Sequence, residues 1–130
     1  NMQLLSRAVG NLLRNAARYA AHAGPVGVKA EQRDGFIYIV VWDSGPGIAD
    51  EHLGMIFDPF YRPDSSRTST TGGVGLGMAI VRTCVESCGG HVVCKNRKSQ
   101  GLKVIIRLKA SGDIVASGVT HSDFALPDTD

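Results

Sequence analysis

The stretch that decides the fold is residues 36–47, FIYIVVWDSGPG. From Phe36 to Trp42 the run is continuously apolar, which is typical of a strand that is covered on both faces of a sheet. Asp43 follows directly, and a carboxylate at such a buried position needs hydrogen-bond donors. The glycines and proline of residues 44–47 then indicate a loop. The stretch therefore predicts a central strand that ends in one acidic side chain and a tight loop. Taken alone, it favours a simple strand-to-helix turn in which Asp43 is a capping residue.

The residues before this strand predict its partner. Apolar and other residues alternate over 26–30, which is the pattern of a strand with one buried face. Asp34-Gly35 is a strong signal for a tight turn between two strands. We therefore expect residues 26–43 to form a β hairpin.

Two long helices and one short helix are expected around this hairpin. Residues 2–22 carry apolar residues at helical spacing, and Gly24-Pro25 ends the pattern. Residues 75–88 form the second long helix, which Gly89-Gly90 closes, and Asp50 is a candidate cap for a short helix over 51–56. The apolar positions of the first helix are Leu4, Leu5, Ala8, Val9, Leu12, Leu13, Ala16 and Ala20.

Two further strands, 91–95 and 102–108, complete the pattern. The order is helix, hairpin, short helix, loop, helix and hairpin, which predicts an α+β fold in which the helices cover one face of a sheet. Residues 110–130 contain four aspartates and neither lysine nor arginine, and we expect a disordered tail there. The folded domain is thus predicted over residues 1–109.

Composition excludes several classes of protein. The formal net charge is only +2, which argues against a nucleic-acid partner. The start of the chain lacks the pattern of a signal peptide, and the chain is expected to be a piece of a longer protein. Cys84, Cys88 and Cys94 with His91 allow a zinc-site interpretation, but the helical spacing of Cys84 and Cys88 favours small core residues in a reducing compartment.

The first helix has a second, polar stripe. Asn11, Asn15, Arg18 and His22 follow spacings of four, three and four residues, so they share one face. Asparagine in a helix interior costs about 0.5–0.7 kcal/mol relative to alanine, and most solvated faces carry longer polar side chains instead. An asparagine oxygen is a neutral, hard ligand that suits Mg²⁺ beside phosphates.

A glycine-rich sequence, Gly72-Gly-Val-Gly-Leu-Gly77, leads into the second long helix. Glycines let a backbone approach phosphate closely, and a helix N-terminus binds anions. The sequence lacks the Gly-Lys-Ser/Thr of a Walker loop and the preceding strand of a dinucleotide-binding fold. Alone it is weak evidence of a phosphate site.

Together, in this order, the motifs resemble those of the sensor histidine kinases, a family that shares its superfamily with gyrase, a group of heat-shock chaperones and mismatch-repair ATPases. Residues 11–19 look like the N box, 43–47 like the first glycine box, 57–62 like the F box and 73–77 like the second glycine box. The stretch 59–67 is most similar to envelope-stress sensor kinases of the Cpx kind.

The resemblance implies a fold and two cofactors. The fold would be the family's two-layer α/β sandwich (the Bergerat fold), with a mixed sheet under three helices, and the cofactors would be ATP and Mg²⁺. Asn15 would bind Mg²⁺ and act in catalysis, Asn11 would contact the phosphates, and Arg18 would lie near them. Tyr19 would lie beside the adenine.

The remaining motifs would complete the nucleotide site. Asp43 would accept the adenine amine in a pocket shaped by Gly45 and Gly47, and Arg62 of the F box would reach the γ-phosphate. Residues 58–73 correspond to the family's mobile ATP lid. The phosphate cradle would be made by the backbone amides of Gly73, Gly75, Leu76 and Gly77.

Two departures from the family pattern stand out. Val74 occupies a place where the family often has threonine, so a hydroxyl contact is lost while the backbone amides remain. The family also usually has short strands before the N-box helix, and here the chain begins at that helix.

The resemblance implies transfer of the ATP γ-phosphate to a histidine on a separate helical domain of the same kinase. None of the four histidines here is followed by an acidic residue, as the family's acceptor histidine is. The implied parent is a homodimer in the bacterial inner membrane with this domain in the cytoplasm, and its partner is a response regulator. The alternatives are an anti-sigma-type serine kinase and a non-catalytic docking domain. A gyrase-like ATPase needs a catalytic glutamate, which residues 3–22 lack.

Overall fold

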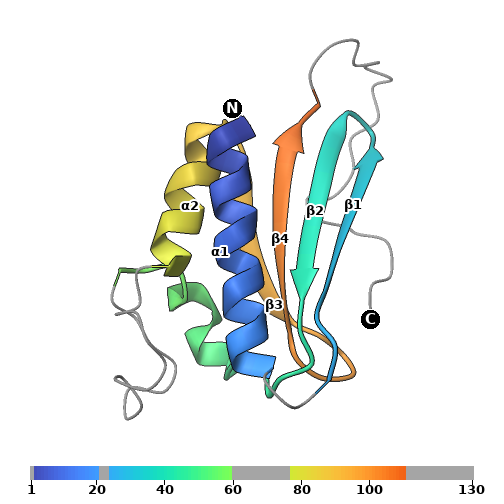
Figure 1. Ribbon diagram of the computed structural model, residues 1–130, viewed down its shortest axis with the longest axis vertical. Coiled ribbons are helices and arrows are strands. Elements are labelled where there is room, and N and C mark those ends of the chain that lie inside the picture. Colours follow the sequence, from blue (N-terminus) through green and yellow to red (C-terminus); the bar gives the residue numbers. More distant parts are fainter. Residues whose placement is uncertain (1, 21–23, 60–76, 111–130) are drawn as a thin grey trace.

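The computed structural model describes residues 2–20, 24–59 and 77–110 (Figure 1). Expectations for Arg62, the lid 58–73 beyond Pro59, and the tail beyond Ala110 therefore lie outside the described residues. The elements in chain order are α1 (Met2–Ala20), β1 (Gly27–Arg33), β2 (Phe36–Trp42), the 3-10 helix η1 (Asp50–Met55), α2 (Gly77–Ser87), β3 (His91–Asn96) and β4 (Leu102–Lys109).

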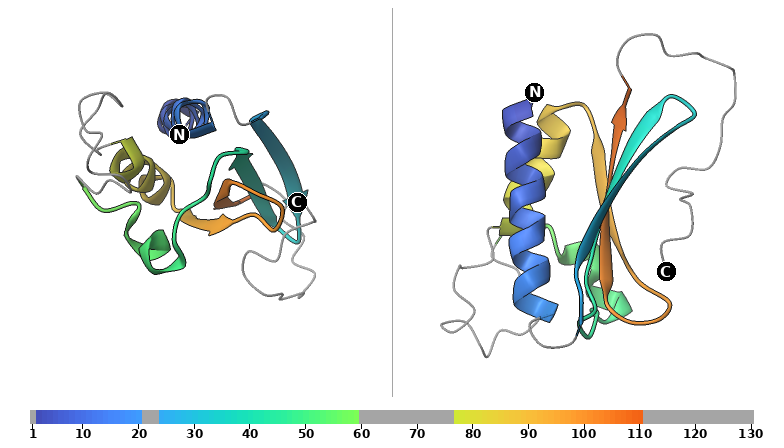
Figure 2. Two further views of the ribbon diagram at one scale, coloured as in Figure 1. Left: turned by 90° about the horizontal axis from the view of Figure 1, so that it is seen from below. Right: turned by 45° about the vertical axis from the view of Figure 1, so that its right-hand side comes forward.

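The molecule has two layers (Figures 1 and 2). The four strands form one sheet in the order β1-β2-β4-β3, and α1, α2 and η1 lie on one side of it. The α+β sandwich with three helices on one face is confirmed. None of the helices in the described ranges is long and apolar enough to cross a membrane.

The expectation of a mixed sheet is wrong for the described strands, because all three strand pairs are antiparallel. The reason is the position of β4. The crossover through α2 makes β3 run in the same direction as β2, but β4 inserts between them and pairs with both. The parallel strands β2 and β3 are therefore not neighbours in the sheet, because β4 lies between them.

The hairpin of β1 and β2 confirms the sequence prediction. Asp34 and Gly35 both have positive φ angles, 52° and 85°, as the favoured two-residue turn requires. The second hairpin, β3 and β4, also lies within one residue of its predicted bounds. Helix α2 ends as expected, since Gly89 has a φ of 79° and the Gly90 N–H donates to the Val85 carbonyl at 2.9 Å.

The short helix differs in detail from the prediction. It is a 3-10 helix, and its N-cap is Ala49, without a side-chain cap hydrogen bond. Asp50 is its first residue, so the expected capping role of Asp50 is wrong. The Asp50 carboxylate instead accepts a hydrogen bond from the Asn96 side chain at 3.3 Å.

The main core lies between the helices and the sheet. Its buried residues come from α1, β2, α2, β3, β4 and the segment after η1. Helix α1 contributes the helical series Ala8, Leu12 and Ala16, each at most 5% exposed, because residues four apart lie on one face. Cys84 belongs to this core, which confirms its interpretation as a small core residue, whereas Cys88 is only partly buried. Cys94 on β3 belongs to the same core.

The opposite face of the sheet carries a second cluster. Tyr38, Val40 and Ile105 are at most 3% exposed there. Strand β2 is therefore buried on both faces and paired on both edges, as its continuous apolar run predicts. Guanidinium groups lie over three aromatic rings near this cluster: Arg33 over Tyr38 at 5.3 Å, Arg97 over Trp42 at 4.6 Å and Arg107 over Phe36 at 4.7 Å.

Candidate nucleotide site

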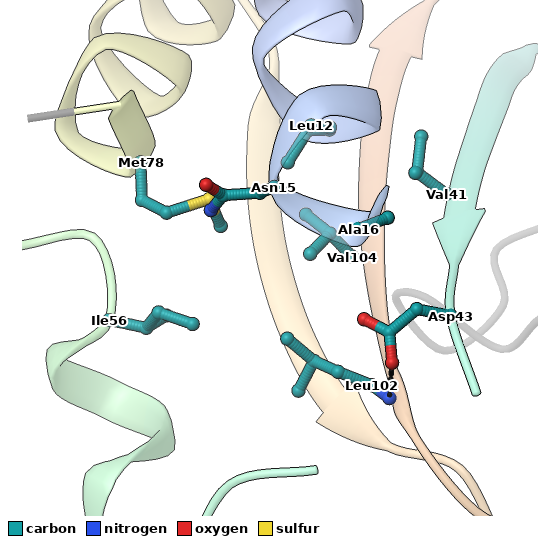
Figure 3. Close-up of a pocket in the computed structure, with 9 residues that line it drawn as sticks. All are labelled: Leu12, Asn15, Ala16, Val41, Asp43, Ile56, Met78, Leu102 and Val104. Atoms are coloured by element: carbon teal, nitrogen blue, oxygen red, sulfur yellow. Dashed lines mark hydrogen bonds between the residues drawn. The ribbon is translucent and has the colours of Figure 1, made fainter. Parts of the chain in front are cut away.

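A pocket opens between the C-terminal half of α1, the end of β2 and the start of β4 (Figure 3). The space between its lining residues, counted together with open solvent at its mouth, is about 300 Å³. Only Asn15 and Asp43 among its lining residues are polar. The apolar lining comes from Leu12, Ala16, Val41, Ile56, Met78, Leu102 and Val104. An apolar pocket with a few convergent polar groups is the usual form of a small-molecule site.

Asp43 is the only buried charged residue in the described part of the chain, and 4% of it is exposed. Its Oδ1 accepts hydrogen bonds from the Gly45 N–H at 2.8 Å and from the Leu102 N–H at 3.2 Å. Its other oxygen is turned toward the pocket (Figure 3). The expectation that this buried carboxylate has donor partners is confirmed, and one oxygen stays directed into the pocket.

The backbone of Asp43 is held as firmly as its side chain. The Asp43 N–H donates to the Leu102 carbonyl at 3.0 Å, and Arg97 Nη1 donates to the Asp43 carbonyl at 2.7 Å. Gln100 Nε2 donates to the Ser44 carbonyl at 3.0 Å. Hydrogen bonds from the β3–β4 turn and the start of β4 therefore hold the backbone at the end of β2 in place.

Arg97, Gln100 and Leu102 were not predicted as site residues. Their contacts with residues 43 and 44 span 54 to 59 positions in the chain. No local pattern marks them, because two of them act on backbone groups and Leu102 acts through its own backbone. Only the pairing of β2 with β4 brings these residues together.

The two glycines of the loop after β2 lie where the prediction requires small residues. Gly45 is buried and donates its N–H to Asp43. Gly47 has a φ of 78°, and a Cβ at this position would lie 2.6 Å from Asn96 Oδ1. Both the backbone conformation and the close neighbour exclude a larger side chain at Gly47.

The structure brings Asn15 but not Asn11 to the pocket. Asn15 lines it from α1, as Asp43 does from the end of β2 (Figure 3). The side chain of Asn11 accepts a hydrogen bond from Arg14 Nη2 at 2.9 Å and does not line this pocket. Arg18 is exposed, and the side chain of Tyr19 lies outside the described part of the chain.

The predicted phosphate cradle is only partly described. Gly77 is the first residue of α2, and a Cβ there would meet none of the described residues within 4 Å. Gly73, Gly75 and Leu76 lie outside the described residues, as does Arg62. Met78, one residue into α2, lines the pocket and so places the start of α2 beside it.

A zinc site of cysteines and histidine has no support in the described part of the chain, where no group of three or more His, Cys, Asp or Glu could hold a metal ion. The Cys94 thiol donates to the Leu53 carbonyl at 3.2 Å. Burial raises the pKa of this thiol to about 11, so it stays protonated at neutral pH. Cys94 therefore joins β3 to η1 as a structural residue.

Comparison with protein families gives one match over nearly the whole chain. The family of histidine kinase-, DNA gyrase B- and HSP90-like ATPases matches residues 1–112. Sensor histidine kinase CpxA of Escherichia coli K12 is 42% identical over 108 residues, which are 83% of this chain and 23% of CpxA. The signal transduction histidine-protein kinase BaeS of the same organism is 34% identical over 110 residues, 85% of this chain and 24% of BaeS.

Solved structures agree with these relatives. The mycobacterial sensor histidine kinase MprB superposes with a TM-score of 0.75 at 34% identity, covering 84% of this chain and 74% of the MprB chain. Full-length ShkA in complex with AMPPNP superposes with a TM-score of 0.69 at 26% identity, covering 86% of this chain and 23% of that chain. The resemblance to kinases of the Cpx kind is confirmed.

The chain spans about a quarter of the length of these two curated relatives. These relatives are histidine kinases, so they favour the histidine kinase interpretation over the serine kinase and docking alternatives. The chain belongs to the histidine kinase-, DNA gyrase B- and HSP90-like ATPase family and corresponds to the ATP-binding catalytic domain of sensor histidine kinases.

Proposed function

We propose that this domain binds Mg-ATP in the pocket between α1 and β2 and transfers the γ-phosphate to a histidine on a separate helical domain of its parent kinase. The observation that carries the proposal is the arrangement of the Asp43 carboxylate. Backbone donors occupy Oδ1, and the other oxygen faces an apolar pocket. A flat base with an exocyclic amine suits this combination of one acceptor and apolar walls.

The pocket residues divide the work of binding. Asp43 accepts the adenine amine, while Leu12, Ile56 and Met78 are among the side chains that exclude water from the base. Gly45 keeps the Asp43 carboxylate oriented through its N–H. Tyr19 at the end of α1 remains a candidate for contact with the base, and Arg18 a candidate for contact with the phosphates.

Asn15 is the proposed Mg²⁺ ligand. Its side chain lines the same pocket as Asp43, and an amide oxygen is a hard, neutral donor that fits this ion. Bound Mg-ATP supplies the phosphoryl group, with part of its negative charge neutralised by the ion. Asn11 would join in contacting the phosphates only after its side chain leaves Arg14. The other proposed phosphate contacts are Arg62, Gly73, Gly75, Leu76 and Gly77.

The acceptor is expected on another domain. His52 is half-buried beside Glu51, with Nε2 3.7 Å from the Glu51 carboxylate, and His91 is an exposed residue that opens β3. An acidic residue follows neither of them in the chain. The proposed partners are therefore the helical phosphoacceptor domain of the parent kinase and a response regulator. The proposed parent is a homodimer in the bacterial inner membrane with this domain in the cytoplasm.

The test is phosphotransfer in trans. This chain is incubated with γ-labelled ATP, Mg²⁺ and the helical domain of its parent kinase, and acid-labile label is followed on each chain. We expect label on the helical domain only, and none when its histidine is replaced by glutamine. Acid-labile label on this chain alone would contradict the proposed division between catalytic and acceptor domains.

A further inference from the structure

The last residue of β3, Asn96, holds the loop after β2 through both atoms of its amide group. Its Oδ1 accepts from the Ile48 N–H at 2.9 Å, and its Nδ2 donates to the Ile48 carbonyl at 2.5 Å. One side chain thus satisfies both backbone groups of one loop residue. A residue of a neighbouring antiparallel strand would make the same pair of hydrogen bonds with its backbone. The Asn96 side chain therefore pairs with Ile48 as a strand residue would.

The loop touches Asn96 without an intervening side chain. Gly47 precedes Ile48, and a Cβ at Gly47 would lie 2.6 Å from Asn96 Oδ1. The positive φ of Gly47 lets the chain turn back toward β3 at this point. Because Gly47 has no side chain, the Asn96 amide can occupy the space beside it.

Both ends of this loop are fastened to the same pair of residues in the sheet. Asn96 on β3 is the register partner of Leu102 on β4. Leu102 binds Asp43 through its own backbone N–H and carbonyl, whereas Asn96 binds the backbone of Ile48 through its side-chain amide. Residues 44–47 bridge these two anchors, so the distance between the anchors determines how the loop is shaped.

We infer that Asn96 is a positioning residue that shapes the loop 44–47 to fit an adenine base; this rests on the proposed function, in which Asp43 binds that base. Without the Asn96 anchor, the loop loses its second attachment, and Gly45, whose N–H holds the Asp43 carboxylate, lies in that loop. An amide is required because it offers one acceptor and one donor side by side, and a carboxylate offers only acceptors. Neither Asn96 nor residues 44–47 line the pocket, so Asn96 acts through Gly45 of the loop on the Asp43 carboxylate, which does line it.

The test compares base selectivity instead of affinity alone. The dissociation constants of Mg-ATP and Mg-GTP are measured by calorimetry for the wild type, Asn96→Ala and the nearly isosteric Asn96→Asp. We expect the preference for ATP over GTP to fall by about tenfold in Asn96→Ala, the effect of losing a partly buried polar contact. Asn96→Asp keeps the acceptor for the Ile48 N–H but sets a carboxylate oxygen against the Ile48 carbonyl and the Asp50 carboxylate, so it should lose at least as much of the preference as Asn96→Ala.

Cys94→Ala is the matched control. Cys94 lies on the same strand two residues earlier, and its thiol also donates to a backbone carbonyl, that of Leu53. This variant should unfold more easily while keeping the wild-type preference for ATP. Should both variants lose selectivity in proportion to their lost stability, Asn96 is only structural and the inference is wrong. If the wild type showed no preference for ATP over GTP, the assignment of Asp43 to the adenine base would be wrong, and the inference about Asn96 would be wrong as well.

Discussion

The backbone of Gly101 lies directly against Asp43. A Cβ at Gly101 would overlap the Asp43 carbonyl group and lie 3.0 Å from Oδ1 of its carboxylate. Gly101 also has a φ of 99°, and its carbonyl accepts from the Arg97 N–H at 2.8 Å, which closes the β3–β4 turn. The turn can therefore approach the nucleotide pocket only because residue 101 has no side chain.

Gly101→Ala should damage both stability and nucleotide binding. Gly89 is the matched control, because it has a φ of 79° but a methyl group there would meet nothing within 4 Å. Both alanine variants carry the strain of a left-handed backbone, about 1–2 kcal/mol. We expect Gly101→Ala to lose a further ~1–3 kcal/mol of unfolding free energy from overpacking, measured by urea denaturation. Equal losses in the two variants would show that the contact with Asp43 relaxes freely.

Asp43→Asn should weaken ATP binding. With the amide oxygen kept on Gly45 and Leu102, the amide nitrogen faces the pocket and opposes the adenine amine, because both are donors. The expected loss is about 1–3 kcal/mol of binding free energy, measured by calorimetry. Asp34→Asn is the control: it makes the same chemical change in the turn at the other end of β2 and should bind as the wild type does. Equal ATP affinity in the wild type, Asp43→Asn and Asp34→Asn would show that Asp43 does not contact the bound nucleotide.

Asn15→Ala should remove the part of nucleotide binding that depends on Mg²⁺. Asn15 is proposed to give the ion an oxygen ligand, and it makes no proposed contact with the base. The affinity for ATP is compared in Mg²⁺ and in EDTA, and the variant should show a smaller difference than the wild type. Asn11→Ala should keep most of this difference, because Asn11 lies beside Arg14 and outside the described pocket. A full Mg²⁺ enhancement in Asn15→Ala would contradict the assignment.

Cys94 should make the fold sensitive to alkaline pH. Burial raises the pKa of its thiol from 9.0 to about 11, so between these values the unfolded chain loses a proton that the folded chain keeps. The contribution of Cys94 to stability is therefore complete below pH 9 and falls as pH rises toward 11. The measurement is the difference in urea midpoint between wild type and Cys94→Ala across this range. A difference that does not change with pH would mean that the thiol titrates normally.

Local features were the most predictable from the sequence. The turn at Asp34-Gly35 and the end of α2 at Gly89-Gly90 depend on residues that are neighbours in the chain, and both are confirmed. Asp43 was found for a similar reason, because a carboxylate directly after an apolar strand needs partners. The family motifs added roles for such residues, which the described geometry of Asp43 and Asn15 supports.

Long-range partners could not be predicted in this way. The mixed sheet was expected from the family resemblance, and no local pattern in the sequence reveals that β4 enters between β2 and β3. Asn96 carries no local sign of its contact with Ile48, 48 positions away. Its role depends on the register that pairs it with Leu102, and register between distant strands is decided by the packing of the whole sheet.

The pocket draws its walls from α1, β2, the segment after η1, α2 and β4, so it is a property of the complete fold. Neither hairpin contains it, and the hydrogen bond from Leu102 to Asp43 closes a loop of 59 residues. Nucleotide should therefore bind the native state alone and raise its unfolding free energy by RT ln(1 + [L]/Kd). We expect the melting temperature to rise with the logarithm of ATP concentration. A shift of the melting temperature by ATP therefore reports that the complete domain is folded.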